Sequence, residues 1–180
     1  SSLINKVPEK LKNDPGLIYE RMRWRRKAKL PTAADFLYDP PDKIENVRNW
    51  WINSRIVVRR LLNKKNYNQA YNILNNHKLP LITDSGREAE WLAGWVAIHH
   101  LKKPKKSIEH FKKVYENTPN ESMKAKAAYW ISEANGLTNQ KNEEVIWLKI
   151  ASKNKFSFYG QNASIKLGNF KFKKEMKILL

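Results

Sequence analysis

The side chains that most often carry out catalysis are scarce in this sequence or are poorly placed for it. The 180 residues contain no cysteine, which excludes disulfides, thiolate nucleophiles and cysteine-bound zinc. His99 and His100 are adjacent, so on a helix they point about 100° apart and cannot share one metal ion without distortion. His77 and His110 add no Glu-x-x-His pair, and no phosphate-binding loop or Gly-x-Ser-x-Gly turn is present. The sequence therefore predicts no metal and no cofactor.

A large excess of positive charge suggests a polyanionic partner. Lysine and arginine number 35 against 17 acidic residues, a formal net charge of +18. Such a field attracts nucleic acid, anionic lipid or the acidic peptides of a cell wall in a salt-dependent way. Only nine of the basic residues are arginine, the side chain that grips phosphate through two bonds, which disfavours specific phosphate recognition. The alternative, favoured by 19 asparagines, is the codon bias of an AT-rich genome on a solvated surface.

Two rows of arginines are the candidate substrate-binding residues. Arg48, Arg55 and Arg59 fall at positions i, i+7 and i+11 of one predicted helix and therefore share a face. Arg21 and Arg25 are four residues apart on an earlier helix and align in the same way. If both rows face inward on a curved array, they are placed to attract the acidic peptides of a cell wall or to steer a glycan strand. The alternative is a solvated face, or ion pairs with acids such as Glu45 and Glu88.

Apolar residues recur at intervals of three and four along most of the chain, which predicts helices. Prolines mark several breaks, because Pro40-Pro41 stops a short helix, Pro104 begins one and Pro119 ends it. The pattern predicts helices over residues 17–28, 31–38, 44–64, 67–77, 84–98, 104–118, 121–135 and 142–153. The tryptophans are predicted to pack in the core, and the alternative is that some stack on sugar rings.

The later helices come in pairs that repeat. Gly94 and Ser132 hold equivalent places 38 residues apart, and Phe111 precedes Leu148 by 37. This length is typical of tetratricopeptide-like repeats, in which each helix hairpin leaves a face that only its neighbour buries. We therefore predict an all-α fold of stacked antiparallel helix hairpins that form a curved α-superhelix. Residues 1–168 are predicted to form one α-superhelical domain, and residues 169–180 a C-terminal tail or the start of a linker.

The sequence contains no predicted membrane span. The longest uninterrupted apolar run covers residues 91–98, far short of the roughly 20 residues that a spanning helix needs. The chain also begins without the charged and then apolar segment of a secretory signal. Either the protein stays in the cytosol, or a signal lies upstream of residue 1.

One short segment near the C-terminal end has an unusual composition. It reads Phe156-Ser157-Phe158-Tyr159-Gly160-Gln161. Tyr159, Ala163 and Leu167 recur every four residues, so we expect a helix that packs through this face, with Gly168 as its C-terminal cap. Taken alone, this pattern predicts only the end of a helix hairpin.

A series of such segments, taken in order, is similar to one protein family. The segments are Asn13-Asp14-Pro15-Gly16-Leu17, Tyr19-Glu20-Arg21, Arg23-Trp24-Arg25-Arg26, Trp50-Trp51, Glu88-Ala89-Glu90-Trp91-Leu92-Ala93-Gly94-Trp95, Ala127-Ala128-Tyr129-Trp130 and Phe158-Tyr159-Gly160-Gln161. In this order and at these separations they resemble the long helical region of the soluble lytic murein transglycosylases of Gram-negative bacteria. The resemblance covers roughly residues 3–168.

The resemblance implies a scaffold without its own chemistry. In that family, helix hairpins coil into a ring or horseshoe that carries a separate lysozyme-like domain at its C-terminal end. That domain cleaves the bond between N-acetylmuramic acid and N-acetylglucosamine and closes a 1,6-anhydro ring, using one Glu in a Glu-Ser-x-Phe motif. This chain offers only Glu121-Ser122-Met123-Lys124, without the Phe. We therefore expect Glu121 to be a first-turn acid favoured by the helix dipole, and we predict no catalytic residue.

Two functions of different classes follow. The first is a non-catalytic scaffold domain of a periplasmic lytic transglycosylase, which binds or positions peptidoglycan and is inactive alone. Its predicted partners are peptidoglycan and the family's C-terminal catalytic domain, while nucleic acid is disfavoured. The second is a helical-repeat adaptor that binds a protein or nucleic-acid partner through a basic face.

Overall fold

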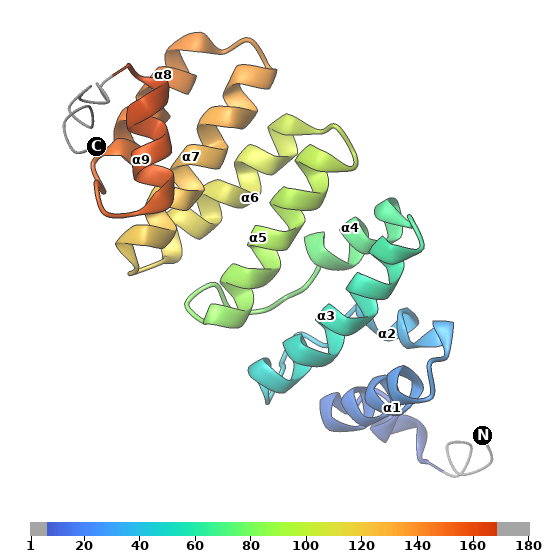
Figure 1. Cartoon of the computed structure of the whole chain (residues 1–180). Helices are drawn as coiled ribbons and strands as arrows, with labels where there is room; N and C mark the ends of the chain where they lie inside the picture. Colours follow the sequence, from blue (N-terminus) through green and yellow to red (C-terminus); the bar gives the residue numbers. More distant parts are fainter. Residues whose placement is uncertain (1–6, 169–180) are drawn as a thin grey trace, which may run out of the picture. The chain divides into compact units, whose positions relative to one another are not determined.

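All regular elements of the computed structural model, which describes residues 7–168, are helical (Figure 1). The all-α prediction is confirmed. The chain divides into two compact units between Lys102 and Lys103. The first unit contains α1 (Pro15–Lys27), α2 (Asp35–Tyr38), α3 (Val47–Asn63), α4 (Tyr67–Asn75) and α5 (Asp84–His99), and the second contains α6 (Pro104–Asn117), α7 (Glu121–Leu137), α8 (Lys141–Ser152) and α9 (Phe158–Lys166). One curved domain over residues 1–168 stays a prediction, and the predicted tail at 169–180 lies outside the described residues.

The first unit is built around α3, which packs against α1, α4 and α5. Two bonds join α1 to α3: the Asn53 amide donates to the Tyr19 hydroxyl (3.1 Å), and the Arg60 guanidinium donates to the Arg26 carbonyl (2.8 Å). Met22 is fully buried in this unit's core. Trp24, one of the tryptophans predicted to pack in the core, is instead 62% exposed.

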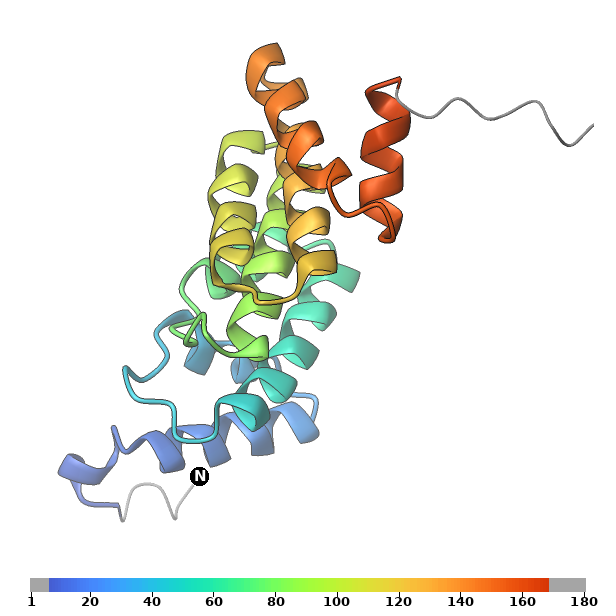
Figure 2. The ribbon, with the colours of Figure 1, turned by 90° about the vertical axis from the view of Figure 1, so that its left-hand side faces the viewer.

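In the second unit, α6, α7 and α8 lie side by side, and α9 lies beside α7 and α8 (Figures 1 and 2). Small side chains allow this close packing, since Ala128, Ala151 and Ala163 are fully buried. Gly168 follows α9 with φ of +73°, which confirms the predicted glycine cap. None of the helices within residues 7–168 is both long enough and apolar enough to cross a membrane.

The repeat is clearest in the residues that cap the N-terminal ends of the helices. The residues Asn46, Thr83, Asn120 and Ser157 recur every 37 residues, and each accepts a bond from a backbone N–H three residues on, at the start of α3, α5, α7 and α9. The other helices keep the same period, because α4, α6 and α8 begin at residues 67, 104 and 141. The predicted period is confirmed. For α5 the sequence also offers Asp84 or Ser85 as the capping residue, but the structure places the cap at Thr83.

The turns between the helices also repeat. Lys65, Lys102 and Asn139 each have a φ near +60° and lie 37 residues apart. A residue in this left-handed conformation ends a helix and lets the next N–H bond back to an earlier carbonyl, as Asn66 does to Leu61 (2.9 Å). Glycine usually occupies this position, so a lysine there is strained by its own Cβ.

Candidate functional site

The two predicted arginine rows lie in different surroundings in the first unit. The Arg21 and Arg25 guanidinium groups lie 5.0 and 4.9 Å from the centre of the Phe36 ring. These cation–π contacts bring the first row together around one aromatic side chain. Both arginines are half-buried, so their aliphatic stems also take part in packing.

Arg48 and Arg55 of the second row line a groove of about 550 Å³ between the N-terminal parts of α3 and α5. Arg55 donates to Glu88 (3.2 Å), and the indole N–H of Trp51 donates to the same carboxylate oxygen (2.6 Å). Glu88 therefore neutralises one of the predicted binding arginines, in agreement with the alternative of internal ion pairs. Arg59 is exposed on α3.

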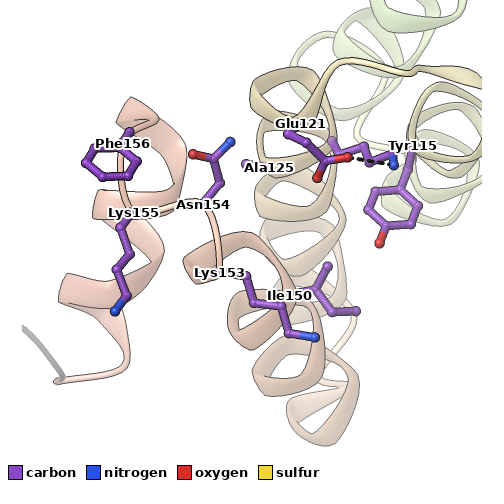
Figure 3. Close-up of a pocket in the computed structure, with 9 residues that line it drawn as sticks. Tyr115, Glu121, Ala125, Ile150, Lys153, Asn154, Lys155 and Phe156 are labelled. Atoms are coloured by element: carbon purple, nitrogen blue, oxygen red, sulfur yellow. Dashed lines mark hydrogen bonds and ion pairs between the residues drawn. The ribbon is translucent and has the colours of Figure 1, made fainter.

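A second groove, of about 590 Å³, lies within the second unit (Figure 3). One wall comes from the start of α7 and from α6, and the other from the end of α8 and the segment that leads into α9. Its lining residues are Tyr115, Glu121, Lys124, Ala125, Ile150, Lys153, Asn154, Lys155 and Phe156. Figure 3 shows Asn154 and Lys153 between Glu121 and Tyr115 on one side and Phe156 and Lys155 on the other. Sequence reasoning missed this groove.

The charges of this second groove are only partly satisfied by the protein. Lys124 pairs with Glu121 (2.8 Å), and this hydrogen bond, followed by the carboxylate's charge, raises the pKa of the Lys124 ammonium. Among the described residues, Lys153 and Lys155 have no ion-pair partner, and the Asn154 side chain makes no hydrogen bond. Three lysines and one glutamate leave the groove with an excess of positive charge.

The segment that carries Asn154 is fixed by the unusual motif at the start of α9. The backbone carbonyl of Asn154 accepts bonds from the N–H and the hydroxyl of Ser157 (3.2 and 3.1 Å), and that hydroxyl accepts from the Gly160 N–H (3.0 Å). A Cβ on Gly160 would lie 1.9 Å from the Asn154 carbonyl oxygen, so only glycine fits here. The motif's Ser and Gly thus hold the groove wall in place. Tyr159 packs on Tyr129 with ring centres 5.5 Å apart.

Neither of two carboxyl groups that could act as a general acid is placed for catalysis. Glu121 begins α7, as predicted, and its side chain is 72% exposed, whereas a general acid needs a desolvated carboxyl group. Glu90 is buried, 3.3 Å from His77 Nε2. The Leu79 N–H donates to His77 Nδ1 (2.8 Å), so the ring's proton is on Nε2 and faces Glu90. This pair is internal and lines neither groove.

The described residues contain no group of three or more His, Cys, Asp or Glu side chains that could hold a metal ion. The chain is therefore an all-α protein of repeated helices, with a basic groove in its second unit. In comparisons with known proteins, the chain matches no family model, no curated protein and no solved structure. The chemistry of its own residues and the order of its motifs are therefore the basis for a functional proposal.

Proposed function

We propose that this chain is a non-catalytic scaffold domain of a periplasmic lytic transglycosylase, which binds peptidoglycan and is inactive alone. The observation that supports it is that the motifs resembling those of that family contact one another between helices. The indole N–H of Trp51 in one motif donates to Glu88 in another, and the ring of Tyr129 packs on the ring of Tyr159. Tyr19 of the first segment packs on Trp50, with ring centres 6.2 Å apart.

Contacts of this kind between helices explain why these residue types occur in this order. A helical repeat is stable only when each helix packs on its neighbour, so a related scaffold needs the same residue types at these contacts. Residues that merely cover a solvated helix are free to differ. The proposal thus rests on contacts between motifs, and not on any motif alone.

The charge of the chain supports a polyanionic ligand. The net charge of +18 attracts such a ligand over a range set by the salt concentration. The stem peptides of peptidoglycan carry many carboxylates, and the cations of the groove in the second unit are lysines, which act as point charges rather than as bidentate phosphate forks. Among the polyanions considered, the cell wall therefore suits this chain better than nucleic acid.

The proposal is tested by sedimenting the purified 180-residue chain with peptidoglycan sacculi across a salt series. We expect sedimentation that weakens as salt rises, and no release of anhydro-muropeptides during a long incubation. A gel shift with RNA at the same salt concentrations is the comparison. Release of anhydro products by this chain, or tight sequence-selective RNA binding without sedimentation, contradicts the proposal, and the second result favours the adaptor.

A further inference from the structure

The groove of the second unit has features that select one part of peptidoglycan. We propose that it binds the acidic stem peptide, and not the glycan strand, with peptide carboxylates held by Lys153 and Lys124. This inference rests on the proposed function and assigns the ligand of one site within it. A volume of about 590 Å³ lies in the range of small-ligand sites, which suits a peptide of a few residues.

The cations of the groove favour carboxylates. Lys153 caps the C-terminal end of α8 and, among the described residues, has no acidic partner. Lys124 is held on the opposite wall by Glu121, whose second oxygen makes no hydrogen bond within the described residues. A peptide that carries carboxylates and an amino group therefore finds three cations and one anion in the same groove.

The polar group between these charges favours a peptide backbone. The Asn154 side chain offers two N–H donors and one carbonyl acceptor, the same groups that a peptide bond displays. Its own backbone carbonyl is already occupied by Ser157, so the side chain alone faces a ligand. Figure 3 shows this amide between the segment leading into α9 and the Glu121 side of the groove.

The aromatic residues of the groove are poorly arranged for a sugar. A sugar ring stacks on a flat aromatic face, but the Tyr115 ring meets Trp147 edge-on, with centres 5.3 Å apart and planes at 89°, and is partly buried by that contact. The Phe156 ring, 98% exposed, lies on the far side of Asn154 from Tyr115. The two rings therefore do not form one platform along the groove.

The test uses the whole chain and a soluble stem tripeptide of alanine, γ-D-glutamate and diaminopimelate, with binding measured by calorimetry. Two ligands serve as controls: the same tripeptide with its carboxylates amidated, and a tetramer of N-acetylglucosamine. We expect saturable binding of the acidic tripeptide, loss of binding on amidation, and no competition from the sugar. Equal binding of the acidic and amidated peptides, or competition by the sugar, overturns the inference.

Two substitutions locate the site. Lys153→Glu is expected to weaken tripeptide binding by about tenfold, because it replaces an attraction with a repulsion at contact distance. Asn154→Ala is expected to weaken it by a few-fold while the groove's charge stays the same. The matched control is Lys105→Glu, an exposed lysine in the first turn of α6, about 15 Å along that helix from Tyr115, which should leave binding unchanged. Circular dichroism confirms that each variant is folded, and equal affinities of Lys153→Glu and Lys105→Glu overturn the assignment.

Sacculi separate this inference from the proposed function. Glycan strands stripped of their peptides by an amidase no longer form a particle that sediments, so they are coupled to beads. We expect these beads to leave the chain in the supernatant, whereas intact sacculi carry it into the pellet. A chain that sediments equally with intact sacculi and with stripped strands contradicts the peptide site and leaves the scaffold proposal standing. A chain that sediments with neither contradicts the scaffold proposal itself.

Discussion

The two grooves differ in how the protein uses its own charges. In the first unit, Glu88 accepts bonds from both Arg55 and Trp51, so a predicted ligand-binding arginine is engaged in structure. In the second unit, Glu121 engages only Lys124, and Lys153 and Lys155 have no acidic partner among the described residues. The two grooves therefore differ in how many of their basic residues the protein's own acids neutralise. We expect the basic residues that are left unneutralised to be the ones that can bind an anion.

The largest expected effect comes from the glycines that close the same turn in both units. A Cβ on Gly160 would lie 1.9 Å from the Asn154 carbonyl oxygen, and one on Gly86 would lie 2.2 Å from the Pro80 carbonyl oxygen. Because backbone must shift in both cases, Gly160→Ala and Gly86→Ala should each lower the free energy of unfolding by about 2–4 kcal/mol in urea denaturation. Only Gly160→Ala should also abolish tripeptide binding in the folded fraction.

Gly136→Ala is the matched control for these glycines. Its added Cβ meets only the end of the flexible Glu144 side chain, at 3.1 Å, and alanine is the better helix former. We expect no loss of stability. A loss as large as that of Gly160→Ala would show that the effect comes from removing any glycine, and not from the two helix starts.

Removing the glutamate of each groove tests the comparison directly. Glu88→Ala takes the acceptor away from the buried Trp51 N–H and should cost about 1–2 kcal/mol of unfolding free energy. Glu121→Ala breaks a pair between two solvent-exposed side chains, so its cost should be far smaller. Equal stability losses in both variants would remove the distinction between the grooves.

The turns between helices offer a smaller test of the same two regions. Lys65→Gly, in the first unit, should raise the unfolding free energy by about 0.5–1 kcal/mol, because its φ of +61° is strained for a side chain with a Cβ. Asn139→Gly, at the equivalent place in the second unit, should raise the unfolding free energy by less, since asparagine tolerates this conformation. Lys64→Gly is the control, because Lys64 has a φ of −84° and gains no relief.

The pH dependence should separate stability from binding. Burial, and then the nearby positive charges of His100 and Lys102, lower the pKa of His99 in the first unit below its ordinary value of 6.5. Below pH 6.5 the unfolded chain therefore binds more protons at His99 than the folded chain does. The contribution of His99 to the free energy of unfolding is complete above pH 6.5 and is lost as the pH falls below it. His99→Gln should flatten this decline in a series of thermal melts. Tripeptide affinity should change little over the same range, because no histidine lines the second groove.

Much of the helical fold is predictable because apolar spacing and proline act locally. The period was visible through Phe111 and Leu148, whereas the caps that mark it most clearly were missed. Asn46, Thr83, Asn120 and Ser157 are three residue types with one shared ability, to accept a bond from a helix N–H. A comparison of residue identities alone therefore misses this repeat, whereas a comparison of which residues can cap a helix finds it.

The site was harder to predict, because it depends on partners far apart in the sequence. Helical spacing placed Arg48 and Arg55 on one face, but it could not show that Glu88, 33 residues after Arg55, would meet that face. The groove of the second unit escaped notice for a related reason. Its key residues, Lys153 to Phe156, lie between two helices and show no periodicity. The only signal in the sequence that could have indicated this groove is a polar, lysine-rich segment directly before a helix that begins with Ser-x-x-Gly.

The identical spacing of the four caps has a consequence for how this chain tolerates changes in length. Each cap serves a helix start within its own segment, so a segment of 37 residues carries a complete set of start and stop signals. Duplicating or deleting one such segment keeps every helix beginning at a suitable residue, whereas an insertion of another size inside a helix rotates its packed face away from its neighbour. The protein can therefore change length by whole modules, and the groove of the second unit can be copied or lost without rebuilding the rest.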